Sequence, residues 1–220
     1  MDGTRTFLIG RHRVVVIDPG PDMEAHVRTL SAALEPAKEV QVLLTHRHGD
    51  HAGALPGLLE TTGASLKEMK EGDRVSTDEG DLVALEIPGH TRDHLGFHWV
   101  DAGALFVGDL LLGRGNTTWI GEYLGCIQDY LDSLEKIRAV GAEVIYPGHG
   151  PPIISPDRTL DRFRRHRLER LEEVRRAREE NLDGSPEDLA GAIYGGEIPE
   201  KLKKAARSSV EAALYHLDQE

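Results

Sequence analysis

One six-residue segment, His46-Arg47-His48-Gly49-Asp50-His51, concentrates side chains that bind metal ions. It directly follows an apolar run that predicts a buried strand. Residues i and i+2 of an extended chain point to the same side, so His46 and His48 can grip one ion together. Asp50 and His51 follow in a turn that Gly49 permits, and they can reach a second ion. A polar, solvated loop is the alternative, but loops seldom place three histidines and an aspartate at a strand end.

Three further apolar runs end in a glycine next to a single ligand-type residue. They are followed by Pro88-Gly89-His90, Gly108-Asp109 and Pro147-Gly148-His149. In α/β sheets, sites form at the carboxyl ends of strands, so four such ends can converge on one place. All the donors are imidazole nitrogens or carboxylate oxygens, which suit zinc, manganese or iron. The sequence therefore predicts a centre for two divalent metal ions, with zinc as the expected metal.

The elements needed to position these ligands alternate between strands and helices. The predicted strands span residues 14–17, 40–45, 82–87, 95–100, 104–107 and 144–146, and the predicted helices span residues 23–34, 54–62 and 123–140. Buried β-branched runs indicate the strands, and apolar residues at helical spacing indicate the helices. Asp22 is the expected N-cap of the first helix, while Gly63 and Gly141 are expected to end the other two. We predict an α/β body over residues 1–155.

The composition changes after Pro152. Ser155-Pro156-Asp157 predicts the start of a long helix that runs to about Asn181. Ser185-Pro186-Glu187-Asp188 predicts a capping box, and Pro199 and Ser208 are each expected to open a further helix. Residues 156–220 are therefore predicted to form an all-helical subdomain.

Composition excludes several classes of protein. The 220 residues include 38 acidic and 26 basic side chains, for a net charge of −12, which argues against a general nucleic-acid coat protein. The single cysteine, Cys126, excludes an internal disulfide and a thiolate metal cage. No apolar run approaches 18 residues, and residues 1–20 lack a signal-peptide pattern, so we expect a cytoplasmic protein without membrane contact.

Residues 46–51 match the HxHxDH signature of the metallo-β-lactamase superfamily, and the later histidines and Asp109 follow in that family's order. The resemblance covers about residues 4–155 and implies an αββα sandwich with a two-metal site at one edge. It also implies a ligand set: His46, His48 and His90 for the first metal, Asp50, His51 and His149 for the second, and Asp109 as the bridge. Asp18 resembles the aspartate that lies beneath the metals in this family.

The tail is similar to that of the lactamase-beta-like group, which includes a mitochondrial single-strand endoribonuclease. The similarity lies in Tyr146-Pro147-Gly148-His149-Gly150-Pro151 and in an arginine-rich helix that contains His166-Arg167. In that group the tail is typically a winged helix. Here the chain leaves little room for a β wing after its last helix, so a winged-helix-like, all-helical tail is expected.

The implied chemistry is hydrolysis by a metal-bridging hydroxide. Two divalent ions, the seven ligands and the hydroxide leave a site charge of about +1, which suits attack on a phosphodiester or a carbonyl. Oxygen-reducing di-iron relatives usually carry a glutamate where this chain has His48, which argues against redox chemistry. Asp50 is assigned a double role, as ligand and as general base. His94 is a candidate either for supporting the ligands or for protonating the leaving group.

The first hypothesis for the substrate is single-stranded RNA. The segment from Arg158 to Arg178 holds nine arginines and four acidic residues, a basic strip on an acidic protein. The predicted substrate contacts are Arg164, Arg165, His166 and Arg167. Trp119 and Tyr123 are candidates for stacking on bases. A solvated helix with internal charge pairs is the alternative interpretation of this segment.

Two other functions remain open. The same metal site would serve a thioester or ester hydrolase of the hydroxyacylglutathione hydrolase type, which the acidic surface favours. The third hypothesis is a metal-binding module without turnover, which the complete ligand set disfavours. β-Lactamase activity is expected only as a side reaction, because fold does not fix function.

Overall fold

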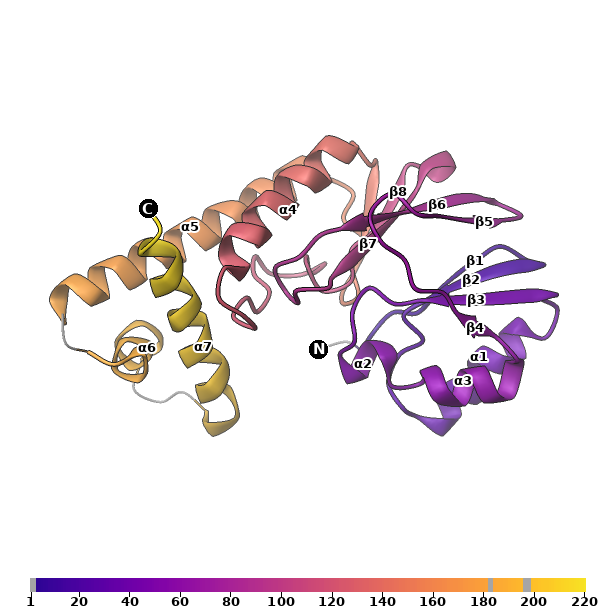
Figure 1. The fold of residues 1–220 in the computed structure, drawn as a ribbon, viewed down its shortest axis with the longest axis horizontal. Helices are drawn as coiled ribbons and strands as arrows, with labels where there is room; N and C mark the ends of the chain where they lie inside the picture. The colour runs from indigo at the N-terminus through magenta and orange to yellow at the C-terminus, as the bar shows by residue number, and fades with distance from the viewer. Residues whose placement is uncertain (1–2, 182–183, 196–198) are drawn as a thin grey trace.

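The computed structural model describes residues 3–181, 184–195 and 199–220, and it contains two β-sheets lying face to face between layers of helices (Figure 1). The first sheet has the order β1 (Phe7–Ile9), β2 (Arg13–Ile17), β3 (Glu39–Leu43) and β4 (Ser65–Leu66). The second has the order β5 (Arg74–Thr77), β6 (Gly80–Glu86), β7 (Leu95–Trp99), β8 (Ala104–Phe106) and β9 (Val144–Tyr146). This arrangement confirms the predicted αββα sandwich.

The first sheet is buried on both faces, because helices cover its outer face and the second sheet covers its inner face. Val14 and Val16 pack against the outer helices α1 (Glu24–Leu34) and α3 (Leu55–Thr62), whereas Val15 and Ile17 join the core between the sheets. This alternation is the period of two expected of a strand. Strands β2 and β3 are parallel, so both end at the same edge. The first ligand segment leaves from that edge.

The second sheet brings its own ligands to the same side of the sandwich. Strands β6, β7 and β8 are antiparallel in turn, and β9 is parallel to β8, so β6, β8 and β9 all end at one edge. The segments that follow these three strands carry His90, Asp109 and His149. A helix, α4 (Cys126–Val140), covers the outer face of this sheet.

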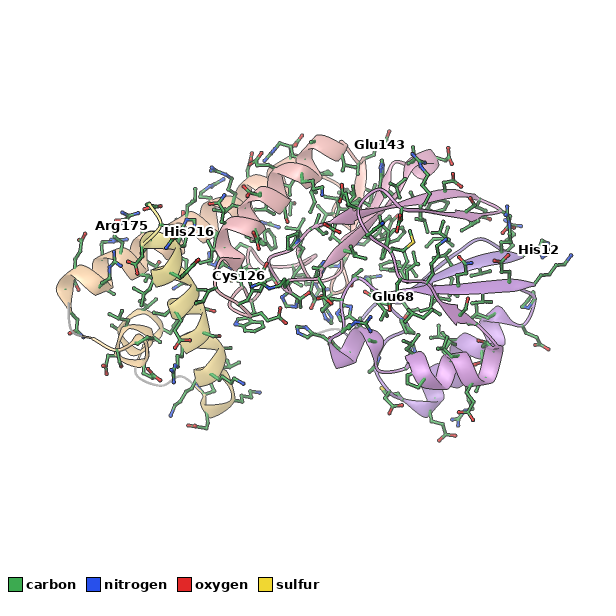
Figure 2. All side chains as sticks on the ribbon, viewed as in Figure 1. His12, Glu68, Cys126, Glu143, Arg175 and His216 are labelled. Atoms are coloured by element: carbon green, nitrogen blue, oxygen red, sulfur yellow. The ribbon has the colours of Figure 1, made fainter. Side chains whose placement is uncertain are left out.

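Three helices follow the body: α5 (Pro156–Glu180), α6 (Pro186–Tyr194) and α7 (Glu200–Leu217). Helix α5 lies along α4, and α6 and α7 gather at its far end (Figure 1). Arg175 of α5 and His216 of α7 lie close together there (Figure 2), and both face Glu220. One apolar cluster runs from β8 and β9 through all of these helices, so the division after residue 155 stays a prediction.

The described part of the tail contains no strand after residue 155, as expected of an all-helical region. Across the described ranges, no helix combines the length and the apolar character needed to cross a membrane. The capping box at Ser185 is present, with both of its hydrogen bonds to Asp188 formed. Gly63 and Gly141 end their helices in the left-handed conformation, as predicted.

Several local expectations were wrong. Helix α7 continues through Ser208, whose hydroxyl donates to the Ala205 carbonyl within the helix and so cannot cap a new one. Asp22 is not the cap of α1, which begins after Met23 without a side-chain cap. Helix α4 begins at Cys126, three residues later than expected. Strands β1, β4 and β5 were not predicted.

Candidate metal centre

Three histidines from both sheets form the first group of candidate ligands. His46 and His48 follow β3, and His90 follows β6. One ligand atom from each lies within 4.8 Å of the others. The Nε2 atom of His90 is 3.1 Å from Nδ1 of His48. This is the trio that the resemblance assigns to one ion.

The second group combines two carboxylates with two histidines. Ligand atoms of Asp50, His51, Asp109 and His149 also lie within 4.8 Å of one another. Nε2 of His149 is 3.1 Å from Oδ2 of Asp50 and 3.4 Å from Oδ2 of Asp109. The same Asp109 oxygen is 4.0 Å from Nε2 of His90 in the first group. Asp109 therefore stands between the groups, where a bridging ligand would stand.

Three buried nitrogen and oxygen atoms of the candidate ligands make no well-formed hydrogen bond within the protein. His46 Nε2, His51 Nε2 and Asp109 Oδ1 are all buried without such a bond, although the last two atoms lie 3.3 Å apart. Buried polar atoms in folded proteins are nearly always hydrogen-bonded, so three orphans in one cluster need an explanation. Divalent ions bound by imidazole and carboxylate would complete all three atoms. The side chains present therefore fit a pair of metal ions.

Asp18 holds the base of this centre. Its carboxylate accepts hydrogen bonds from the backbone N–H and the hydroxyl of Thr45, each at 2.7 Å. It also accepts from Nδ1 of His51 at 2.8 Å, which leaves Nε2 of that ring turned toward the second group. A carboxylate behind a ligand histidine fixes its ring orientation and raises its basicity. Asp18 is buried and adopts a left-handed backbone with φ of 53°.

Backbone carbonyls orient two further histidines. Nδ1 of His90 donates to the Trp119 carbonyl at 2.9 Å, and Nδ1 of His149 donates to the Gly3 carbonyl at 2.9 Å. In each ring the other nitrogen, Nε2, then faces the cluster, where it could bind a metal ion once unprotonated. Sequence reasoning missed Thr45 and Gly3. Carbonyl acceptors and a threonine carry no residue-type signal for a metal site.

Two glycines allow the strand ends to approach closely. At Gly108, with φ of 47°, an added Cβ would lie 2.4 Å from Oγ1 of Thr45. At Gly148, it would lie 2.6 Å from Cε1 of His51 and 2.8 Å from Oδ1 of Asp109. All three distances are shorter than real Cβ contacts. These glycines are therefore required for the ligands to meet.

His94 lies within the centre, in contact with one residue of each group. It is buried and stacks on His46 with ring centroids 4.8 Å apart. Its Nε2 accepts a hydrogen bond from the Asp109 backbone N–H at 3.3 Å. Burial lowers the pKa of His94 well below its usual value, so the ring is neutral. Of its two candidate roles, this geometry favours supporting Asp109 over protonating a leaving group.

The electrostatics of the two groups differ. Burial lowers the pKa of His46 far below its usual value. Burial opposes a charge on His51 too, but the neighbouring carboxylates of Asp109 and Asp18 outweigh it and raise its pKa to about 10. Burial likewise opposes ionisation of Asp109, while His149 and His51 keep its pKa well below the usual range. Metal binding at the second group would therefore displace a proton from His51.

The four predicted substrate contacts do not share one surface. Arg167 is buried, and its guanidinium donates to the Thr118 carbonyl at 3.0 Å. Nε of Arg164 is 3.5 Å from a carboxylate oxygen of Glu135 on α4. Arg165 is exposed, and His166 is half-buried. Their contact with substrate stays a prediction.

Comparison with known proteins supports the fold and the lineage. The metallo-beta-lactamase superfamily matches residues 2–83 and 67–149 of the chain. A beta-lactamase-like protein 2 homolog from Caenorhabditis elegans is 28% identical over 239 residues, which cover 99% of this chain and 79% of that protein.

Solved structures agree with this match. A beta-lactamase domain protein from Burkholderia ambifaria has a TM-score of 0.81 at 20% identity, over 97% of this chain and 81% of that one. A metallo-beta-lactamase family protein from Thermus thermophilus has a TM-score of 0.78 at 20% identity, over 98% of this chain and 88% of that one. The chain therefore belongs to the metallo-beta-lactamase superfamily, whose members are typically binuclear metal-dependent hydrolases.

Proposed function

We propose that this protein is a zinc-dependent hydrolase of small esters or thioesters. The observation that carries the proposal is an apolar cavity of about 540 Å³ that shares a wall, Trp119, with the metal centre. The Trp119 carbonyl holds His90, and its indole ring packs edge-on at 6.1 Å from the same imidazole. A cavity of this size and lining suits an acyl or aryl group better than a run of phosphates.

Two divalent ions in this centre would supply a water of lowered pKa and positive charge to stabilise an oxyanion. We assign to Asp50 the transfer of the proton from that water. Its Oδ2 faces Nε2 of His149 at 3.1 Å and accepts from the Thr4 hydroxyl at 3.2 Å. Its side chain is 48% exposed, so a proton received there can pass to solvent. Zinc is proposed because nitrogen and oxygen donors in this number suit it, with manganese and iron as alternatives.

Parallel hydrolysis assays test this proposal. The purified protein, with its metal content measured, is given an acylated glutathione and a labelled single-stranded RNA. We expect thioester cleavage that disappears in Asp109→Ala and falls at least about a hundredfold in Asp50→Ala, with both variants folded. Cleavage of RNA alone would overturn the choice of substrate. Cleavage of neither substrate would favour a metal-binding module without turnover.

Single-stranded RNA is the second candidate. It is supported by Arg158, Arg162 and Arg165, which are exposed on α5 at spacings of four and three residues and so form one basic strip. Replacing all three by glutamine should weaken RNA binding and flatten its dependence on salt. The matched control replaces three other arginines by glutamine, Arg11, Arg28 and Arg74, which are exposed on the body far from α5 in sequence. Equal RNA binding by the α5 variant and the control variant would exclude the basic strip as an RNA-binding surface.

A further inference from the structure

The cavity beside Trp119 has a basic side as well as an apolar one. Trp119, Tyr194 and Leu202 line it together with His166, Arg167 and Arg170. None of the described residues that line it is acidic, although the whole chain carries a net charge of −12. An apolar cavity with a cationic wall is complementary to an apolar molecule that carries a negative charge.

Arg167 is the unusual member of this wall. The residue is only 6% exposed, and its Nε atom has no hydrogen-bond partner. Within the described ranges, no carboxylate lies at ion-pair distance from it. Its guanidinium instead donates to the Thr118 carbonyl and lies 5.5 Å from the Tyr130 ring centroid. A buried charge without a counter-ion is costly, so Arg167 is poised for an anion that the protein does not supply.

The neighbouring basic residues are already compensated. Nη1 of Arg170 pairs with Glu173 at 2.6 Å, and its guanidinium lies 5.0 Å from the Tyr194 ring centroid. The ring of His166 accepts a hydrogen bond from the Asn116 amide at 3.3 Å. The anion would therefore be drawn to Arg167, while Arg170 and His166 complete the wall.

The cavity and the metal centre are connected through consecutive backbone groups. The Thr118 carbonyl accepts from Arg167, and the next carbonyl, of Trp119, accepts from the ligand-type His90. The indole N–H of Trp119 donates to the Ala205 carbonyl of α7 at 3.2 Å, which ties the same segment to the tail. A group bound in the cavity would thus lie against the same short segment that orients the metal-ligand candidate His90.

We propose that this cavity binds the part of the substrate remote from the scissile bond, an aromatic or other apolar group that bears a carboxylate, with Arg167 as its anchor. The inference rests on the proposed hydrolysis of small esters and narrows its substrate class to anionic ones. The apolar group would cover Trp119, Tyr194 and Leu202, and the carboxylate would provide the counter-ion that Arg167 lacks.

Calorimetric binding of two probes of one shape tests the cavity without turnover. The probes are 2-naphthoate, which carries the charge, and 2-naphthamide, which does not. We expect 2-naphthoate to bind at least about tenfold more tightly, and equally well to zinc-loaded and chelator-treated protein. Equal affinity for the two probes would overturn the role of Arg167. Loss of 2-naphthoate binding on chelation would place the probe on the metals and overturn the cavity.

Variants locate the site. Leu202→Trp, at a side chain that is 49% exposed, should fill the cavity and weaken 2-naphthoate binding at least about tenfold. The matched control is Leu168→Trp on α5, which is 38% exposed and does not line the cavity, and it should bind like the wild type. Unchanged binding in Leu202→Trp would overturn the proposal. If the cavity binds 2-naphthoate but no ester is cleaved, the proposed function fails, and the cavity stands as a binding site for apolar anions but not as part of a substrate site.

Discussion

Asp18, which follows β2, links the segment after β3 to the metal-ligand candidate His51. Its carboxylate holds Thr45 by two hydrogen bonds and His51 by one, and all of these groups are buried. The residue tolerates φ of 53° because a short polar side chain is one of the few that visit the left-handed region. A substitution that keeps its shape but removes its charge isolates the electrostatic contribution.

Asp18→Asn should therefore weaken zinc binding at the second group by about 10–100-fold, because His51 loses the carboxylate that orients it and raises its basicity. A competition titration with a coloured chelator measures this affinity. Asp22→Asn, at an exposed aspartate nearby in the chain, is the control and should leave the affinity unchanged. Wild-type affinity in Asp18→Asn would mean that His51 is held by its packing alone.

At Gly148 the prediction rests on steric contacts and not on charge. An alanine there would put Cβ 2.6 Å from His51 and 2.8 Å from Asp109, so one of these ligands must move. We expect Gly148→Ala to bind about one metal ion in place of two and to lose at least about tenfold in activity. Metal analysis by mass spectrometry checks the first expectation. Gly191→Ala on α6, where a Cβ meets nothing within 4 Å, should keep both ions.

The candidate ligands could be predicted from the sequence, whereas their supports could not. His46, His90, Asp109 and His149 each stand just after an apolar run, and strand ends converge by topology. The groups that hold them are defined only by the tertiary structure. The Trp119 carbonyl and the Gly3 carbonyl are backbone atoms that any residue would provide, so no residue type marks them.

At the scale of elements, Asp78 joins the two sheets. It follows β5 in the turn before β6, and its carboxylate accepts from the backbone N–H groups of Arg11, His12 and Arg13, which lead into β2. These three donors, Arg11 first, lower the pKa of Asp78 from 3.8 to about 2 and outweigh the opposing effect of burial. A carboxyl group whose pKa falls on folding stabilises the folded state only while it is ionised.

Asp78→Asn should therefore lower the Tm at neutral pH, and the difference from the wild type should shrink with acid. The contribution is complete above the unfolded pKa of 3.8 and is lost as the pH falls through the folded pKa of about 2. Thermal unfolding of both proteins between pH 2 and pH 7 measures the difference. A Tm difference that is constant down to pH 2 would show that packing, rather than charge, is what the substitution removes.

Elements with strong local signals were predictable, and short ones were not. The capping box at Ser185 forms its hydrogen bonds with Asp188, three residues later, so the local sequence is enough to predict it. Ser208 has the same residue type, but its hydroxyl bonds back to Ala205 inside a helix whose apolar face is already buried. Strand β1 has three residues and is defined by pairing with β2, which local periodicity does not reveal.

At the scale of the whole molecule, the candidate metal centre draws on both sheets. Four of its seven ligand-type residues follow β3 in the first sheet, and three follow β6, β8 and β9 in the second. Metal ions bound there would link the two halves of the sandwich at one edge. The tail contacts this edge through the segment after β8, where the Trp119 indole N–H donates to the Ala205 carbonyl on α7 and Arg167 on α5 donates to the Thr118 carbonyl.

Chelation should consequently loosen the body more than the tail. Ligands that bind only the folded state stabilise it by about 4 kcal/mol when present at a thousand times their Kd, so removing zinc should lower the Tm. Amide hydrogen exchange should rise in residues 46–51, 88–94, 108–113 and 147–151, where the orphaned donors lie, and stay unchanged in α6 and the C-terminal half of α7. Asp109→Ala, which removes the residue between the two groups, should show a smaller Tm response to zinc. An equal rise in exchange across α6 and the strand ends would instead mean that body and tail unfold as one cooperative unit.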